Sequence, residues 1–129
     1  MQEQFLIFIL ILAVTAIVSF VYAIWRGRND EQILRSIIQN SPIPTFVIST
    51  DHKILYWNKA LAGVSGIHAS QLLGTDEQWR AFYKSPRSCL SDLILNNTIH
   101  NAPSLYAGEV TKSKLLADAY EVTEFFPDL

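Results

Sequence analysis

Residues 5–25 read FLIFILILAVTAIVSFVYAIW, a run of 21 residues without a charged side chain. As a helix this run is roughly 31 Å long at about 1.5 Å per residue, which matches the roughly 30 Å hydrocarbon core of a bilayer. Its polar members, Thr15 and Ser19, can bond their hydroxyl groups to carbonyls of the helix itself. Tyr22 and Trp25 lie at the end of the run, where amphipathic aromatic rings prefer the headgroup region. The run therefore predicts one transmembrane helix.

A cleaved signal peptide is the alternative for an apolar segment at the N-terminus. It fits poorly, because Met1–Gln4 contain Glu3 and no basic residue, the apolar run is too long, and no small-residue cleavage motif follows it. Arg26 and Arg28 come directly after the run, and basic flanks remain on the cytoplasmic side of a membrane. We therefore expect residues 1–28 to form an uncleaved single-pass anchor, with the rest of the chain in the cytoplasm.

Charge and cysteine content exclude several classes of function. The chain has 10 basic and 12 acidic residues and a formal net charge of −2, so no basic surface for nucleic acid is expected. Cys89 is the only cysteine, which rules out an intramolecular disulfide and argues against a cysteine-based metal site. His52, His68 and His100 lack metal-ligand spacing. No c-type haem motif or phosphate-binding glycine loop is present, so no motif implies a cofactor, and we expect this chain not to be an enzyme.

A short amphipathic segment at residues 29–41 follows the anchor. Asn29-Asp30-Glu31-Gln32 supplies a capping residue with Gln three positions on, which indicates that a helix starts or restarts there. Asn40-Ser41-Pro42 ends that helix. Its apolar face can pack on the chain's own domain or on a second copy in a short coiled coil, and it consists of Ile33, Leu34, Ile37 and Ile38. In the second case the segment is a dimerising and signalling helix.

Beyond this segment the apolar pattern changes period. Runs at 45–49 and 53–57 are β-branched and aromatic and flank the turn-forming Thr50-Asp51-His52, which predicts a hairpin. Asn58 is suited to cap a helix over 59–64 that Ser65-Gly66 ends. Helical turns are expected at 70–73 and 75–83, and Ser88 can cap a helix that reaches about residue 97. Alternation that begins at Tyr120 indicates a strand before Pro127. The predicted fold class is therefore α+β.

The stretch from Ile33 to Gly74 resembles the start of a PAS sensor domain. The sequences that carry the resemblance are, in order, Ile37-Ile38-Gln39-Asn40-Ser41-Pro42, Asp51, Tyr56-Trp57-Asn58-Lys59-Ala60, Ser65-Gly66-Ile67 and Gln71-Leu72-Leu73-Gly74. Three later sequences resemble PAS domains of bacterial histidine kinases and chemoreceptor-like transducers: Gly74-Thr75-Asp76, Trp79-Arg80-Ala81-Phe82-Tyr83 and Phe125-Phe126-Pro127-Asp128-Leu129. The resemblance implies a five-stranded antiparallel sheet whose last strands supply much of a ligand pocket.

The resemblance also implies an incomplete domain. The last strands of a PAS sheet would begin where the sequence stops, at Leu129, so we expect residues 42–129 to form a PAS-like domain truncated at its C-terminus. A two-stranded hairpin is marginally stable alone, and its apolar face needs more strands or a covering helix. The expected architecture is one transmembrane helix, a short linker helix, and an antiparallel hairpin with several short helices.

Apolar and aromatic side chains around the expected hairpin are the candidate binding residues. They can line a cavity for a small apolar or planar ligand, or they can form an ordinary core. The candidates are Ile48, Tyr56, Trp79, Phe82 and Tyr83. Arg80 lies among them and could pair with a ligand carboxylate. No residue is expected to be catalytic or to bind a metal.

Two functions from different classes fit these observations. The first is a sensory input module of bacterial signal transduction, located in the inner membrane, whose PAS-like domain binds a small ligand or a protein partner and signals through the linker helix. Its implied partners are the membrane, a second copy of the chain and a downstream kinase or other effector. The second is a structural or assembly subunit whose incomplete sheet accepts a strand from another chain, or a fragment of a longer sensor histidine kinase without independent activity.

Overall fold

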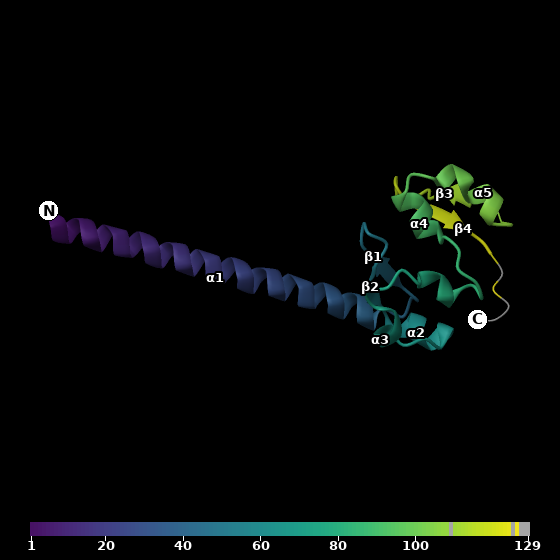
Figure 1. Ribbon diagram of the computed structural model, residues 1–129, viewed down its shortest axis with the longest axis horizontal. Helices are drawn as coiled ribbons and strands as arrows, with labels where there is room; N and C mark the ends of the chain where they lie inside the picture. The colour runs from purple at the N-terminus through teal and green to yellow at the C-terminus, as the bar shows by residue number, and fades with distance from the viewer. Residues whose placement is uncertain (109, 125, 127–129) are drawn as a thin grey trace. The chain divides into compact units, whose positions relative to one another are not determined.

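The computed structural model describes residues 1–108, 110–124 and 126. The chain divides into two compact units, Met1–Ile38 and Gln39–Leu129. Among the described residues, one long helix is followed by short helices and two antiparallel hairpins (Figure 1). This arrangement confirms the α+β fold class.

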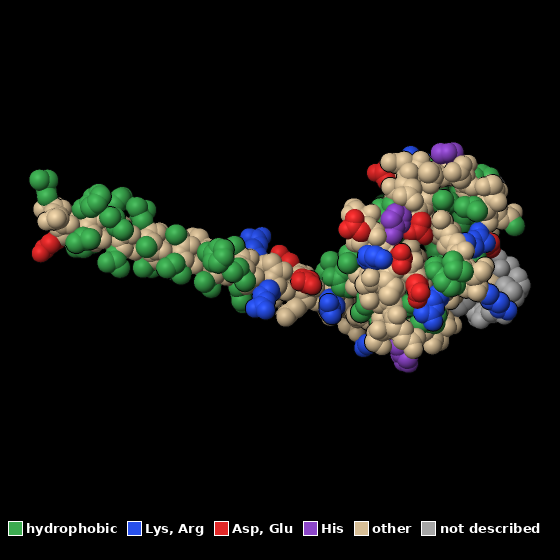
Figure 2. Space-filling model, viewed as in Figure 1, with side chains coloured by type: hydrophobic (Ala, Val, Ile, Leu, Met, Phe, Trp, Pro, Cys, Tyr) green, Lys and Arg blue, Asp and Glu red, His purple; other side chains and the backbone are tan. Residues whose placement is uncertain are grey.

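The first unit belongs to a single long helix, α1 (Gln2–Asn40), of 39 residues. The helix continues through Asn29-Asp30-Glu31-Gln32, so the capping signal at that point does not start a new helix. None of its residues is buried, and on the face seen in Figure 2 apolar side chains cover most of the helix up to the first basic residues. Thr15 Oγ1 donates to the carbonyl oxygen of Leu12 at 2.9 Å, which satisfies this hydroxyl within the helix. By length and composition, α1 is able to cross a membrane.

The second unit contains the hairpin expected from the sequence, formed by β1 (Phe46–Ile48) and β2 (Ile54–Trp57). Phe46 lies opposite Trp57, and the register shifts after Val47. Ile54 and Trp57, at the two ends of β2, are both buried although they lie three positions apart, because the register shift places one extra residue, Leu55, between the paired positions. Leu55 is exposed.

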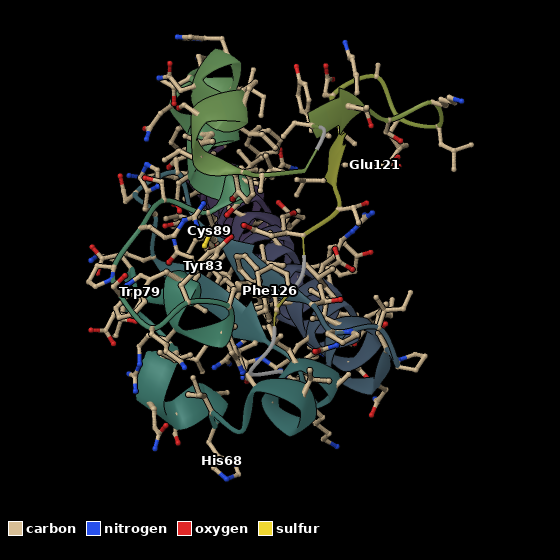
Figure 3. The ribbon with its side chains drawn as sticks, turned by 90° about the vertical axis from the view of Figure 1, so that its right-hand side faces the viewer. His68, Trp79, Tyr83, Cys89, Glu121 and Phe126 are labelled. Carbon is tan, nitrogen blue, oxygen red and sulfur yellow. The ribbon has the colours of Figure 1, made fainter. Side chains whose placement is uncertain are left out.

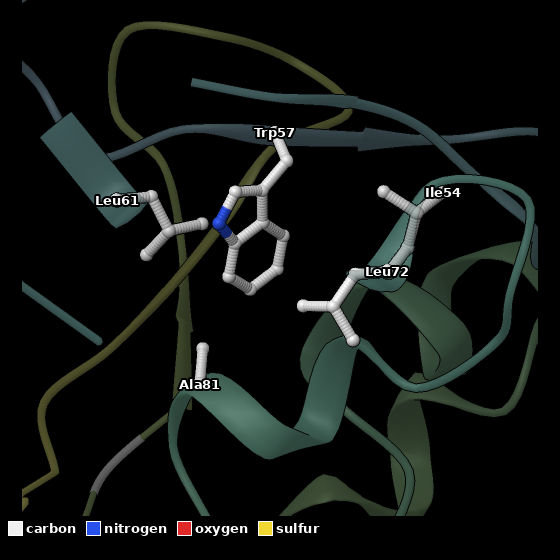
Figure 4. Close-up of a cluster of buried hydrophobic side chains, with 5 residues drawn as sticks. All are labelled: Ile54, Trp57, Leu61, Leu72 and Ala81. Atoms are coloured by element: carbon white, nitrogen blue, oxygen red, sulfur yellow. The ribbon is translucent and has the colours of Figure 1, made fainter. Parts of the chain in front are cut away.

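Three short helices follow the hairpin: α2 (Lys59–Ser65), α3 (Ala69–Leu72) and the 3-10 helix η1 (Gln78–Ala81). Asn58 caps α2, and Gly66 ends it in the left-handed conformation with a φ of 70°. These elements pack around a first core cluster with Trp57 at its centre (Figure 4), which consists of Ile54, Trp57, Leu61, Leu72 and Ala81. The indole N–H of Trp57 donates to the carbonyl oxygen of Ile67 at 3.0 Å, so this buried ring has its polar group satisfied.

A second core cluster lies in the later part of the unit and consists of Leu93, Ala102 and Tyr106. The elements of this part are α4 (Leu90–Leu95), the 3-10 helix η2 (Ile99–Asn101), α5 (Ala102–Leu105), β3 (Val110–Lys112) and β4 (Tyr120–Val122). The two strands form the second antiparallel hairpin, and Val110 and Val122, which face each other in it, pack against this cluster.

The expected cap of α4 is wrong. The helix is capped at Cys89 and not at Ser88, because the backbone N–H of Cys89 donates to Asp92 Oδ2 at 2.8 Å and so fixes the first turn one residue later. The helix also ends at Leu95, before the expected residue 97.

A strand is present where the alternating run begins at Tyr120, as β4, but it ends at Val122, and its partner β3 was not expected. The described residues form two separate two-stranded sheets, an arrangement consistent with an incomplete PAS-like fold. Within Phe125-Phe126-Pro127-Asp128-Leu129, Phe126 is described and the other four residues lie outside the described part of the chain.

Candidate functional site

An apolar cavity of about 210 Å³ lies between the two core clusters of the second unit. One wall comes from β1 and the residues that follow η1, and the other comes from α4, the end of α5 and β4. The side chains that define these walls are Phe46, Phe82, Tyr83, Leu90, Tyr106 and Val122. The cavity is therefore built from residues that lie up to 80 positions apart, between Phe46 and Phe126.

Aromatic rings cluster along one side of the cavity. The ring centre of Phe82 lies 6.1 Å from that of Phe46 and 5.4 Å from that of Phe126. Tyr83 meets Phe126 edge to face at 5.8 Å between ring centres. Figure 3 shows Tyr83, Cys89 and Phe126 near one another, and all three line this cavity. Tilted and edge-to-face rings at these separations are the favourable geometry for aromatic packing.

A charged and hydrogen-bonded network joins the cavity wall to the segment after β4. The Tyr83 hydroxyl donates to Glu124 Oε2 at 2.8 Å, and the guanidinium carbon of Arg87 lies 4.1 Å from the centre of the Tyr83 ring. Arg87 also donates to the carbonyl oxygen of Leu105 and lies 5.2 Å from the centre of the Tyr106 ring. Burial, together with the bond to Glu124, raises the pKa of Tyr83 far above its usual range, so the phenol stays neutral.

Cys89 lines the cavity but is not reactive there. The side chain is buried, and burial raises the pKa of its thiol to about 12. A thiol with that pKa is protonated near neutral pH and is a poor nucleophile. Cys89 therefore contributes apolar surface and the cap of α4.

A polar cluster connects the turn of the first hairpin to α4. His52 Nδ1 lies 2.7 Å from Asp92 Oδ1, and His52 Nε2 lies 3.1 Å from Asn96 Oδ1. The same Asp92 oxygen accepts a hydrogen bond from Gln78 Nε2 at 2.7 Å. Asp92 and Gln78 are both buried, so η1, α4 and the hairpin turn are joined through one buried carboxylate. Cys89 N–H occupies the other carboxylate oxygen.

The geometry of this cluster favours the protonated form of His52. Both ring nitrogens lie opposite oxygen atoms, and only the doubly protonated ring donates to both. The hydrogen bond to Asp92 is the largest cause that raises the pKa of His52 above 6.5. The charged ring is therefore bound more strongly in the folded chain than in the unfolded chain.

The stability of the second unit is expected to fall as pH rises. Because the pKa of His52 is raised on folding, the stabilisation is fully present below about pH 6.5 and is lost as pH rises through the folded-state pKa. Thermal unfolding of the full chain in detergent micelles should therefore give a higher midpoint at about pH 6 than at about pH 8. His52→Asn, which suits a left-handed turn and does not titrate, should abolish this difference. His68→Asn should retain it, and an equal loss in both variants would contradict the assignment.

The structure places the predicted binding residues in different surroundings. Phe82 and Tyr83 line the apolar cavity, whereas Ile48 packs against the first core cluster. Trp79 lines a separate polar groove that also contains His52 and Asp92. Tyr56 is half-buried on β2 and is not a residue of the apolar cavity.

Other predicted residues lie away from the apolar cavity. Arg80 Nη1 forms an ion pair with Glu77 Oε2 at 2.9 Å on the surface, so its charge is already balanced. Asn58 is completely buried at the start of α2. Of the four residues in the predicted dimer face, Ile38 is half-buried. The other three are exposed: Ile33, Leu34 and Ile37.

Several cavity residues were not found from the sequence. Phe46 shares a strand face with Ile48, so strand alternation was a signal that could have found it. Leu90, Tyr106 and Val122 carry no local signal, because their approach to the first hairpin depends on contacts between distant segments.

Residues 32–87 match the family model of the PAS fold. The matched segment extends from the end of α1 through η1 to Arg87, and it contributes the Phe46, Phe82 and Tyr83 wall of the cavity. No curated protein matches the chain, and no solved structure matches it. The match supports a PAS domain over this segment, and the hairpin and the short helices are consistent with an incomplete one.

Proposed function

We propose that this chain is a membrane-anchored sensory input module of bacterial signal transduction, whose PAS-like unit binds a small ligand in the apolar cavity. The observation that carries the proposal is the position of the cavity, which has one wall inside the PAS-matched segment and one wall outside it. A ligand that contacts both walls stabilises the conformation in which the walls lie at the matching distance. A sensor needs two conformations that bind its ligand with different affinity, and such a cavity can provide them. The proposed role involves no covalent chemistry by this chain.

A short path of contacts leads from the cavity to the end of α1. Phe46 lines the cavity and lies opposite Trp57 in the first hairpin. The carbonyl oxygen of Trp57 accepts a hydrogen bond from Gln39 Nε2 at 3.0 Å, and Gln39 is the penultimate residue of α1. Thr45, directly before Phe46, donates its backbone N–H to Asn58 Oδ1 at 2.9 Å. A displacement of Phe46 therefore acts on the residues that hold the end of the helix.

The proposal includes the inner membrane as location and a second copy of the chain as partner. Arg26 and Arg28 favour a cytoplasmic position for the residues that follow the apolar run. Ile33, Leu34 and Ile37 are exposed apolar side chains, and confinement to a membrane raises the effective concentration of two copies. A downstream kinase or other effector would receive the signal.

One observation favours the second candidate function, a structural or assembly subunit. Each of the two sheets in the described part of the chain has two strands, so each has edges that no neighbouring strand of the sheet covers. Exposed strand edges are templates for a strand from another chain. In this function a different protein, and not a second copy, would be the constant partner.

Disulfide crosslinking in membranes separates these functions. In a Cys89→Ala background of the full chain, Leu34→Cys introduces one thiol on the proposed dimer face. Two such helices in contact should crosslink as a homodimer within minutes of mild oxidation. Gln32→Cys, on the opposite face of the same helical turn, is the matched control and should crosslink far more slowly.

Each outcome decides between the candidates. Fast homodimer formation by the Leu34→Cys chain alone supports the sensory module with a signalling helix. Equal rates at positions 32 and 34 contradict a specific helix pair. Stoichiometric crosslinking to a different protein at position 34 supports the assembly subunit and contradicts the sensory module.

A further inference from the structure

We propose that the apolar cavity takes an uncharged aromatic hydrocarbon of one or two rings and discriminates against molecules of the same shape that carry a hydrogen-bonding group. The inference rests on the proposed function and specifies the ligand class of the same cavity. It follows from the volume of the cavity, the rings in its walls and the state of the polar atoms that its side chains carry.

The volume limits the ligand to a small ring compound. The cavity measures about 210 Å³, below the roughly 300–1,000 Å³ of pockets that hold drug-sized ligands. An apolar protein cavity of about 150 Å³ is known to bind benzene. A cavity of the present size therefore accommodates a single substituted ring or a fused pair of rings.

Aromatic rings form much of the cavity wall and favour a flat ligand. Phe82 lies tilted to both Phe46 and Phe126, and all three rings belong to the lining. Offset and tilted ring pairs are more stable than pairs stacked face to face. A further flat ring in the cavity can continue this tilted packing, so the walls favour an aromatic ligand.

The charged groups beside the cavity are already engaged. Arg87 donates to the Leu105 carbonyl and lies 4.0 Å from Glu124 Oε1, and Glu124 also accepts from Tyr83. An ionised ligand would lose its hydration without gaining a free counter-charge from these residues, which is strongly unfavourable. The ligand is therefore uncharged.

The polar side chains of the described lining offer no strong hydrogen bond to a ligand. The Tyr83 hydroxyl donates to Glu124 Oε2 at 2.8 Å and also interacts with the Tyr106 side chain. Ser91 Oγ is enclosed by its neighbours and presents no surface to a molecule in the cavity. The protonated thiol of Cys89 is only a weak donor. A ligand hydroxyl would therefore lose its hydrogen bonds to water without a replacement, which disfavours it.

The test compares toluene and phenol, two probes of nearly the same shape that differ by a methyl and a hydroxyl group. The full chain is placed in lipid nanodiscs with labelled methyl groups, and each probe is titrated while the methyl signals of Leu90 and Val122, which line the cavity, are followed. The signal of Leu115, which is 91% exposed, reports nonspecific partitioning. Affinities are referred to the free aqueous concentration of each probe, because toluene also dissolves in lipid.

Toluene should bind at least about tenfold more tightly than phenol, because its methyl group gains from burial whereas an unpaired hydroxyl loses. Val122→Phe adds a ring to the cavity wall and should abolish the shifts that toluene causes at Leu90. Val64→Phe, at an exposed position on α2, is the matched control and should retain them. The ratio of toluene to phenol affinity is measured on the parent chain, so it decides the question even where Val122→Phe does not fold.

The outcomes distinguish this inference from the proposed function. If phenol binds as tightly as toluene at Leu90 and Val122, the discrimination is refuted while a ligand-binding cavity remains supported. If neither probe shifts these methyl signals, or if Leu115 shifts equally, the ligand class is refuted. If, in addition, the Leu34→Cys chain forms no specific homodimer, the sensory module is refuted as well.

Discussion

Replacement of Asn58 by Ala is expected to lower the free energy of unfolding of the second unit by about 3–5 kcal/mol. Asn58 is completely buried, and its Oδ1 accepts hydrogen bonds from the backbone N–H groups of Thr45 and Leu61, both at 2.9 Å. Its Nδ2 donates to the carbonyl oxygens of Ile43 at 2.8 Å and Ser41 at 3.3 Å. Ala would remove the cap of α2 and, in the same step, leave backbone groups of the segment after α1 without their partner.

The effect is measured by denaturant unfolding of the full chain in detergent micelles, followed by tryptophan fluorescence. Asn58→Asp is the informative second variant, because it keeps the oxygen acceptors and loses the donors to Ser41 and Ile43. It should be less destabilising than Asn58→Ala at a pH where the new carboxyl can be protonated. Asn101→Ala, at an exposed position, should change stability by less than about 0.5 kcal/mol. A loss below about 1 kcal/mol for Asn58→Ala would contradict the network.

Replacement of Asp92 by Ala should cost about 2–4 kcal/mol. Asp92 Oδ2 accepts from the N–H of Cys89 and so starts α4, while Oδ1 accepts from Gln78 and contacts His52. Gln78 is 2% exposed, and its Oε1 has no partner among the described residues. Without Asp92 the buried amide of Gln78 would lose its one hydrogen bond in the described structure. That desolvated amide, together with the lost cap, accounts for the expected cost.

The same unfolding measurement at two pH values adds a second readout for this variant. Asp92→Ala should greatly reduce the decrease in stability between about pH 6 and about pH 8, because the largest cause of the raised His52 pKa is gone, whereas the contact with Asn96 remains. Asp92→Asn keeps the shape and one amide oxygen, so it should be less destabilising than Asp92→Ala. Asp118→Ala, an exposed carboxylate, should retain both the stability and its pH dependence. An unchanged pH dependence in Asp92→Ala would show that His52 does not act through this carboxylate.

Local signals in the sequence predicted the first hairpin and α2 well. Alternating β-branched and aromatic residues mark both strands, and Asn58 and Gly66 stand where a helix cap and a left-handed terminator are needed. The start of α4 was placed wrongly because the hydroxyl of Ser88 is the stronger cap in isolation. The Asp92 carboxylate, three residues after Cys89, determined the actual start.

The cavity could be predicted only in part. Phe82 and Tyr83 carry a helical spacing that suggests a shared face, and both line the cavity. The opposite wall comes from Tyr106 and Val122, whose positions depend on the fold of the second core cluster and not on neighbouring residues. The continuity of α1 was also missed, because a capping sequence inside a helix is compatible with further helix when no proline interrupts it.

The backbone conformation at His52 couples this turn residue energetically to α4. Its φ of 62° lies in the region where glycine or asparagine is at ease and where another side chain costs on the order of 1–2 kcal/mol. A mutation to either residue would relax the turn, and the ring contacts of His52 with Asp92 and Asn96 offset that cost. Loss of Asp92 would leave the backbone cost at position 52 without its main compensation. Substitutions at positions 52 and 92, 40 residues apart, should therefore not be additive in stability.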